Sequence, residues 1–330
     1  MRVAVVFDME GVSQIGDPRE TLPLYAEYWR TGRSKLTDDI VAAACGLLEA
    51  GASEVVVCSH HGAGGEPWPN VLVDRLPDGV RLSPNLEDFE IALHADAMFQ
   101  VGVHAPGGDP SFMSHTTLPG LRLRIGSEIL SESHIWAWSS GLPLLGMVGS
   151  AELGRVLGSL DAVPFLAVQR SLDRANALPV HATPEQSRDE ITAFAAACYR
   201  HAARRTVLSP GGPVRLEASV QNGDEAAPEM QVAGWARLDR TTFVIERETW
   251  RADDEAIPAA IDAAAGAAWE PYAFWFDELD PTSEATAMTF PAQRWARSDA
   301  MTRAWTADQP RAWFDPGAVD APLEGLTTPI

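Results

Sequence analysis

The first half of the chain alternates short apolar runs with stretches that repeat at helical spacing. Residues 2–7 and 54–58 are near-continuous apolar runs rich in β-branched residues, which is typical of strands buried in a parallel sheet. Between them lies a predicted helix that Thr37 caps and Gly51 ends, with one apolar face made of Ile40, Val41, Ala44, Leu47 and Leu48. The order strand, helix, strand predicts a βαβ unit and therefore a parallel sheet.

The alternation continues to about residue 170. Further strands are expected at residues 97–103, 121–125, 144–148 and 164–168. The alternating Leu and Arg residues of 121–125 predict an edge or half-exposed strand. A helix is expected at residues 127–140, and the capping sequence Thr-Pro-Glu-Gln at Thr183 predicts a helix that runs to about residue 205.

These elements predict an α/β fold with a mainly parallel sheet flanked by helices, followed by a smaller α+β subdomain. Three segments are expected: an α/β metal-binding catalytic domain at 1–210, an α+β subdomain at 211–268, and a Trp- and Pro-rich extension at 269–330. In the subdomain, strands are expected at 214–220 and 241–246 and an Ala-rich helix at 253–268. The aromatic residues of the extension favour a packed arm or an oligomer contact over simple disorder.

Charge and composition exclude several classes of function. The chain has 25 Lys and Arg residues against 46 Asp and Glu residues, a net charge of −21, so nucleic-acid and anionic-membrane partners are not expected. Lys35 is the single lysine and no glycine-rich loop precedes it, which argues against Schiff-base and P-loop chemistry. Three cysteines without a C-x-x-C motif, and an N-terminal apolar run that stops at Asp8, predict a cytoplasmic protein without a signal peptide or membrane helix.

Acidic and histidine side chains follow three of the predicted strands. Asp8 and Glu10 follow the first strand, His60 and His61 the second, and His104 the strand at 97–103. Ligands of open α/β sheets bind at the carboxyl ends of the strands, so these side chains are expected at one edge. Imidazole and carboxylate suit Zn²⁺, and also Mn²⁺ or Co²⁺, and so many candidate ligands suggest a dinuclear site.

Other interpretations use the same residues. An Asp-x-Glu sequence after a strand is commonly a cap or surface turn, and a histidine in a turn is commonly solvated. The sequence from Phe7 to Gly11 also looks like the Asp-x-Asp-Gly signature of haloacid dehalogenase-like phosphatases. Here the second acid is Glu10, Lys35 comes too early for the lysine of that superfamily, and the histidines would have no role.

Four short motifs occur in a fixed order: Asp8-Met9-Glu10-Gly11, Ser59-His60-His61-Gly62, Gly102-Val103-His104-Ala105 followed by Met113-Ser114-His115, and Ser131-Glu132. In this order and spacing, over roughly residues 1–270, the chain resembles the DppA-type D-aminopeptidases, self-compartmentalising zinc metallopeptidases of bacteria. Each motif alone is short, but the ordered set is specific.

The resemblance implies a site with two zinc ions per chain. It assigns Asp8 as the bridging ligand, His115 as the catalytic histidine, and Glu10, His61, His104 and Glu132 as the remaining ligands. His61 rather than His60 matches when the second strand is aligned without a gap. The role of His115 stays open among oxyanion stabiliser, proton shuttle and nucleophile. The resemblance also implies a short D-amino-acid peptide or other small amide as substrate, and a ring-shaped homo-oligomer.

The chain departs from the family pattern around the implied ligands. Relatives usually carry Asp where Ser59 stands, Gly-x-Asn where Ser133–Trp136 stands, and Gly-Asp-Asp where Gly149–Glu152 stands. The implied ligands are kept while the residues around them differ, which favours an enzyme that hydrolyses a related amide with a shifted substrate preference. Two alternatives remain: a hydrolase of a non-peptide amide or lactam, and a catalytically silent metal-binding assembly protein.

Overall fold

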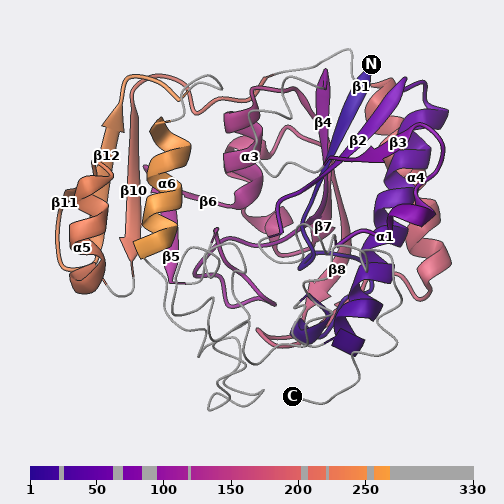
Figure 1. Cartoon of the computed structure of the whole chain (residues 1–330), viewed down its shortest axis with the longest axis horizontal. Helices are drawn as coiled ribbons and strands as arrows, with labels where there is room; N and C mark the ends of the chain where they lie inside the picture. The colour runs from indigo at the N-terminus through magenta and orange to yellow at the C-terminus, as the bar shows by residue number, and fades with distance from the viewer. Residues whose placement is uncertain are drawn as a thin grey trace.

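The computed structural model describes residues 1–21, 26–61, 70–83, 95–117, 120–201, 207–220, 223–250 and 256–267, which form two β-sheets and their helices (Figure 1). The strands of the larger sheet are β1 (Arg2–Phe7), β2 (Glu54–Ser59), β3 (Val80–Leu82), β4 (Ala97–Val103), β7 (Leu144–Ser150), β8 (Phe165–Ser171) and β9 (Ala177–Pro179). Those of the smaller sheet are β5 (Leu121–Ile125), β6 (Glu128–Leu130), β10 (Val214–Val220), β11 (Ala236–Arg237) and β12 (Thr242–Arg247). The helices are α1 (Ala26–Glu49), α3 (Glu132–Ser140), α4 (Pro184–Arg200), α5 (Gly223–Val232) and α6 (Ala256–Ala267), with 3-10 helices at Pro18–Thr21, Val73–Arg75, Leu153–Arg155 and Gly158–Leu160.

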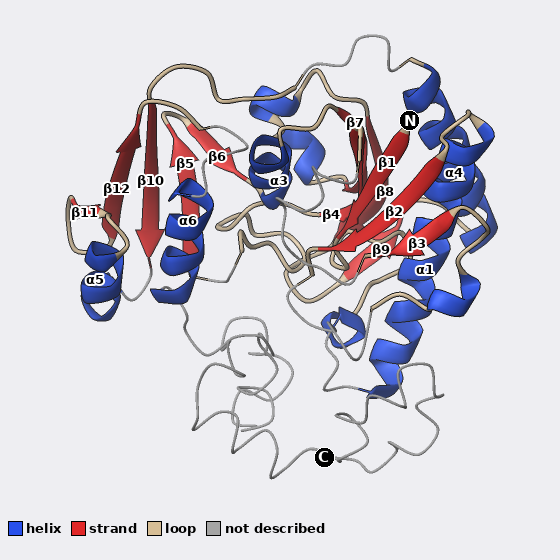
Figure 2. Ribbon diagram, turned by 45° about the horizontal axis from the view of Figure 1, so that its top comes forward, coloured by secondary structure: helices blue, strands red, loops and turns tan. Residues whose placement is uncertain are grey.

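The larger sheet confirms the predicted α/β fold. Within the described residues its order is β3-β2-β1-β4-β7-β8-β9, and every neighbouring pair is parallel except β8 with β9. Helices α1 and α4 pack together on one face, while α3 lies against β4 on the other face, between the two sheets (Figure 2). Strands β4 and β7 are buried along their whole length, as is β1 after its first residue, which explains their continuous apolar sequences.

The smaller sheet is antiparallel and has the order β11-β12-β10-β5-β6 in the described residues. Strand β5 alternates buried and exposed side chains, as predicted, but it lies between β10 and β6 and is not an edge strand. Helix α5 was not predicted, and Pro228 lies within it. Because β5 and β6 come from residues 121–130, the expected boundary at residue 210 does not separate the two sheets.

Two predicted helix starts are wrong. Helix α1 begins at Ala26, so Thr37 lies inside it, where its hydroxyl donates to the carbonyl of Arg33 at 2.7 Å instead of capping the helix. Of the helix expected at 127–140, residues 128–130 form β6, and the helix starts at Glu132. The expected start of α4 is confirmed, since the Thr183 hydroxyl accepts a hydrogen bond from the N–H of Gln186 at 3.2 Å.

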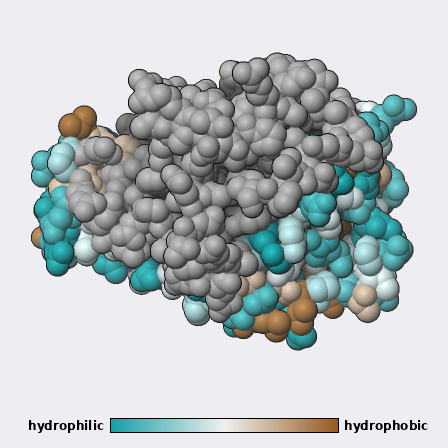
Figure 3. All heavy atoms as spheres, turned by 60° about the horizontal axis from the view of Figure 1, so that its bottom comes forward, coloured by the Kyte–Doolittle hydropathy of each residue, from teal (hydrophilic) through white to brown (hydrophobic). Residues whose placement is uncertain are grey.

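Two predicted segments lie outside the described residues. They are residues 202–206, which were expected to complete α4, and the extension at 269–330. In the part of the chain that is described, no helix combines the length and apolarity needed to span a bilayer. On the face drawn in Figure 3, the described surface is mainly hydrophilic, and its hydrophobic side chains form small separate groups.

Candidate metal centre

The turn after β1 carries Asp8 and Glu10 to the carboxyl edge of the larger sheet, where both side chains are buried. This turn lies directly on the backbone of β4. The N–H of Gly11 donates to the carbonyl of Gly102 at 2.8 Å, and a Cβ on Gly11 would lie 2.0 Å from the carbonyl oxygen of Val103. Glycine is therefore required at position 11 for this close approach, because any side chain would collide with the strand.

Two buried side chains that sequence reasoning missed hold this turn in place. Gln169 on β8 donates from Nε2 to the carbonyls of Glu10 and Ile15, both at 2.8 Å. Asp39 on α1 accepts from the N–H and the hydroxyl of Ser13 at 2.8 and 2.7 Å. Neither residue stands in a motif, because these contacts form only once β8 and α1 pack beside the turn.

Backbone carbonyls fix the ring orientation of His104 and His115. Nδ1 of His104 donates to the carbonyl of Ala105 at 2.9 Å, and Nδ1 of His115 donates to the carbonyl of Met113 at 2.8 Å. The two rings stack with their centroids 4.3 Å apart. A carbonyl oxygen only accepts hydrogen bonds, so each ring carries a proton on Nδ1 and directs Nε2 into the cluster, as a metal ligand requires.

The structure brings all six predicted site residues together as carboxylate–imidazole pairs. Nε2 of His104 lies 3.1 Å from Asp8 and 3.6 Å from Glu132, Nε2 of His115 lies 3.5 Å from Glu132, and Nε2 of His61 lies 3.3 Å from Glu10. Two groups have ligand atoms within 4.8 Å of one another: Asp8, Glu10 and His104, and His104, His115 and Glu132. By distance, His115 is thus placed as well for ligation as for catalysis.

Of the two histidines after β2, His61 is the one that lies against Glu10. The ring of His60 instead packs on the indole of Trp136, with centroids 4.7 Å apart. Nδ1 of His61 lies 3.3 Å from the side-chain amide of Asn70, a buried residue that sequence reasoning did not single out. Asn70 therefore supplies a polar neighbour beside a predicted ligand, and its Nδ2 lies 3.5 Å from the hydroxyl of Ser59.

The loop that carries His115 has an unusual backbone. Met113 and Thr117, on either side of it, have positive φ values of 49° and 63°. The left-handed region is costly for residues other than glycine, so the surrounding contacts must hold the loop in this conformation. Two hydrogen bonds do so: the N–H of Thr117 donates to Oε1 of Glu132 at 2.6 Å, and the N–H of Met113 donates to the carbonyl of Arg174 at 3.1 Å.

The cluster shifts the pKa of five of its members: Asp8, Glu10, His104, His115 and Glu132. Burial alone would raise the pKa of Asp8, but the hydrogen bond and charge of His104 hold it well below its usual range. Burial would lower the pKa of His104, but hydrogen bonds to Asp8 and Glu132 keep it well above its usual value. Burial and the charge of Asp8 raise the pKa of Glu10, and raise that of Glu132 to about 7. Burial and the charge of His104 lower the pKa of His115 to about 3.

The donor set fits divalent cations such as Zn²⁺. Three buried carboxylates lie in one cluster, and Oε1 of Glu10 lies 3.3 Å from Nε2 of His61. Burying several carboxylates together is costly unless cations balance their charge. When ionised, Asp8, Glu10 and Glu132 together contribute three negative charges, which divalent cations would balance. A carboxylate has two oxygens and can bridge two ions, whereas a single Nε2 cannot.

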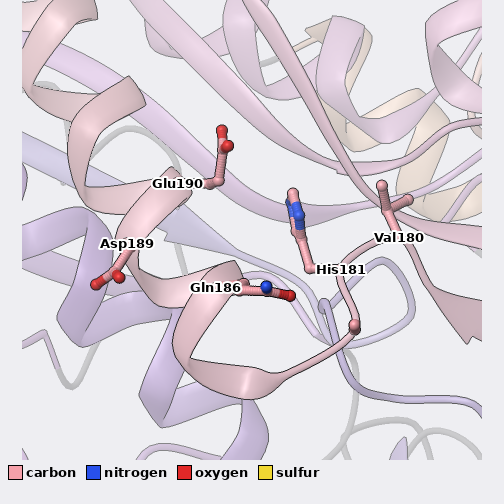
Figure 4. A pocket seen from close by; sticks show the side chains of 6 residues that line it. Val180, His181, Gln186, Asp189 and Glu190 are labelled. Atoms are coloured by element: carbon pink, nitrogen blue, oxygen red, sulfur yellow. The ribbon is translucent and has the colours of Figure 1, made fainter.

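The hollows in the described part of the molecule include the following two. One, of about 530 Å³, is lined by His115 and by residues of β5 and β10. The other, of about 450 Å³, lies at the start of α4 and is lined by Val180, His181, Gln186, Asp189 and Glu190. In Figure 4 the Asp189 carboxylate points away from the His181 ring, so these side chains do not converge on a ligand.

Two comparisons with known proteins returned a match. A family model described as D-aminopeptidase matches residues 1–256. Among solved structures, the chain is similar to the zinc-dependent D-aminopeptidase DppA from Bacillus subtilis, described as a self-compartmentalizing protease. That match has 19% sequence identity and a TM-score of 0.69, and it covers 80% of this chain and 98% of the other. A search of curated proteins found no significant match.

Proposed function

Because the chain belongs to the D-aminopeptidase family and is thus a metallo-aminopeptidase, we propose that its buried cluster binds two zinc ions and that it releases the N-terminal residue of short D-amino-acid peptides. The observation that carries this proposal is the convergence of three buried carboxylates and three histidines at the carboxyl edge of the larger sheet. Mn²⁺ and Co²⁺ suit the same ligands.

In this proposal Asp8 would be shared by the two ions. Glu10 and His61 would hold one ion, and His104 and Glu132 the other. The distances support this division, since Glu10 is paired with His61 at 3.3 Å and His104 with Glu132 at 3.6 Å. When bound, the zinc ions supply Lewis acidity that polarises the scissile carbonyl and activates water.

His115 is the proposed catalytic residue. The carbonyl of Met113 holds its Nδ1 proton, which leaves the Nε2 lone pair facing the cluster and the adjoining 530 Å³ pocket. With a pKa of about 3, caused by burial and by the charge of His104, the ring is neutral at neutral pH. Its Nε2 lone pair can therefore attack the carbonyl without first losing a proton. The burial of the cluster also excludes bulk water.

The proposal is tested by elemental analysis of the purified protein, coupled to a screen of D- and L-aminoacyl amides and dipeptides. We expect close to two divalent metals per chain and hydrolysis that a chelator abolishes and zinc restores. Protein that contains no metal, or that cleaves none of these substrates when loaded with zinc, would contradict the proposal.

We also propose that the enzyme is a homo-oligomer, arranged as a ring. The similarity to DppA supports this, since that protein is described as self-compartmentalizing. An enclosed active site would admit only short peptides. Sedimentation velocity at micromolar concentration measures the assembly state, and a monomer would reject this part of the proposal.

A further inference from the structure

The 530 Å³ pocket beside His115 has a charge opposite to that of the chain as a whole. Arg122 and Arg174 line it, and none of its described lining residues is acidic. The whole chain carries 46 acidic against 25 basic residues, and the adjoining metal cluster contains three buried carboxylates. A pocket of this size falls within the range of small-molecule sites, and its two guanidinium groups favour an anionic group.

Arg122 is held in a fixed position on the pocket wall. Its Nε donates to the carbonyl of Gly107 at 3.2 Å. Gly108, with φ of 90°, lies beneath the guanidinium, and a Cβ there would lie 1.8 Å from an Nη atom of Arg122. The guanidinium of Arg122 can occupy this position only because residue 108 has no side chain. The two Nη groups remain for another acceptor, since no carboxylate of the described residues forms an ion pair with Arg122.

The neighbouring arginine on the same strand shows the contrast. Arg124 lies on the same face of β5, two residues further on, and both its Nε and Nη2 donate to the carboxylate of Glu217. The sheet therefore neutralises Arg124 internally. Arg122 instead lines the cavity that adjoins the catalytic histidine.

We propose that this pocket binds the C-terminal carboxylate of the substrate, with Arg122 as the residue that recognises it. The inference rests on the proposed function and specifies its substrate class: peptides of two or three residues with a free carboxylate. Planar guanidinium groups bind carboxylates through two parallel hydrogen bonds, which fixes both orientation and length. A C-terminal amide carries no charge and offers only one acceptor oxygen, so it fits this site less well.

The experiment compares each free acid with its C-terminal amide. The substrates are D-alanyl-, D-leucyl- and D-phenylalanyl-D-alanine and the three corresponding D-alaninamides, with kcat/KM measured on zinc-loaded protein. We expect wild type to prefer the acids by about 10- to 100-fold, the range for a hydrogen bond to a charged group. Arg122→Ala should lose that preference through a fall in kcat/KM on the acids alone. Arg122→Lys keeps the positive charge but lacks the planar guanidinium, so it should retain part of the preference for acids.

Arg124→Ala is the matched control, because it removes an arginine from the same strand face without touching the pocket. It should keep the wild-type ratio of acid to amide. Equal rates on acids and amides in wild type would overturn this inference while leaving the aminopeptidase activity established. An unchanged ratio in Arg122→Ala would overturn the assignment of that residue. Failure to cleave any of the six substrates would overturn the proposed function itself, and this inference with it.

Discussion

The side-chain amide of Asn70 lies 3.3 Å from Nδ1 of His61, on the opposite side of the ring from Glu10. Oδ1 of Asn70 accepts a hydrogen bond from the indole N–H of Trp29 at 3.3 Å, and Nδ2 lies 3.5 Å from the hydroxyl of Ser59. Asn70 thus connects a predicted metal ligand to the position at which relatives usually carry a carboxylate. Such partners orient ligating histidines and set their basicity.

Replacing Asn70 should therefore change metal affinity without removing a ligand. Because the indole N–H of Trp29 holds Oδ1 of Asn70, the Nδ2 donor faces Nδ1 of His61 and favours a proton on Nε2, so Asn70→Ala should strengthen zinc binding by about 10-fold. Asn70→Asp places an acceptor beside Nδ1 and should bind zinc at least as tightly as wild type. Zinc titration against a competing chelator measures both. Equal affinity of Asn70→Ala and wild type would show that His61 does not depend on this contact.

Asp8→Ala should lose both metals, because the proposed bridging carboxylate contacts both ions. Elemental analysis of the purified variant should give close to zero metals per chain. Asp17→Ala is the matched control: Asp17 lies in the same segment but pairs with Arg19, outside the cluster. Full metal occupancy in Asp8→Ala would contradict a site with two bridged ions.

His115→Ala should keep its metal and lose about 10²- to 10⁴-fold in kcat, the range for removal of a general acid–base or oxyanion group. The distances alone would also allow His115 to be a ligand, so metal content and activity must be measured on the same sample. His181→Ala, on a residue outside the cluster, should behave like wild type. Loss of metal together with activity would reassign His115 as a ligand, and wild-type turnover would leave it without a role.

Asp39 should make the stability of the fold depend on pH. Burial raises its pKa to about 7, against the hydrogen bonds from Ser13, whereas the unfolded chain titrates near pH 4. Below pH 4 the Asp39 carboxyl is protonated in both the folded and the unfolded protein, so its pKa shift does not lower the free energy of unfolding. As pH rises to about 7, wild type loses stability relative to Asp39→Asn, by about 1.4 kcal/mol for each unit between the two pKa values.

Urea unfolding of wild type and Asp39→Asn at pH 5 and pH 8 checks this direction. Other titrating groups are common to both proteins, so their effects cancel in the difference. The free energy of unfolding of the variant should improve relative to wild type at the higher pH. A difference that is the same at both values would show that Asp39 titrates normally in the folded protein.

Trp136 is expected to restrict the substrate. It follows Glu132 by one helical turn, is 5% exposed, and packs on the ring of His60. Relatives usually carry a smaller amide side chain in this motif. We expect wild type to hydrolyse D-alanyl-D-alanine poorly, and Trp136→Asn to raise kcat/KM on it by about 10- to 100-fold. Efficient hydrolysis by wild type that the variant leaves unchanged would make Trp136 a packing residue only.

The parallel sheet could be predicted because its strands are buried on both faces and therefore have continuous apolar sequences. The polar residues that follow β1, β2 and β4 were predictable for the same reason, since parallel strands end at one edge. The predicted ligand Glu132 was different, because within its own segment it has the features of an ordinary helical acid. Only the resemblance to the D-aminopeptidases singled it out, and the structure then brought it to His104.

What the sequence could not reveal are contacts between segments far apart in the chain. Gln169 holds the Asp8–Glu10 turn from a distance of more than 150 residues, and nothing around it differs from an ordinary strand. The start of α1 could not be predicted because its first turns have a weak apolar pattern, whereas Thr37 directly precedes the first clear apolar repeat. The helix predicted from residue 127 failed because β6 forms only by pairing with β5.

The hairpin of β5 and β6 spans the stretch of chain between His115 and Glu132, and β10 pairs along the outer side of β5. A strand from the C-terminal part of the chain thus pairs with the segment that joins two predicted site residues. A truncation that removes the chain after residue 210 would take away β10 and leave that side of β5 without its partner, although β6 would stay paired. The two sheets are consequently not separable units, because a strand that lies between two predicted site residues in sequence needs the C-terminal part of the chain to complete its sheet.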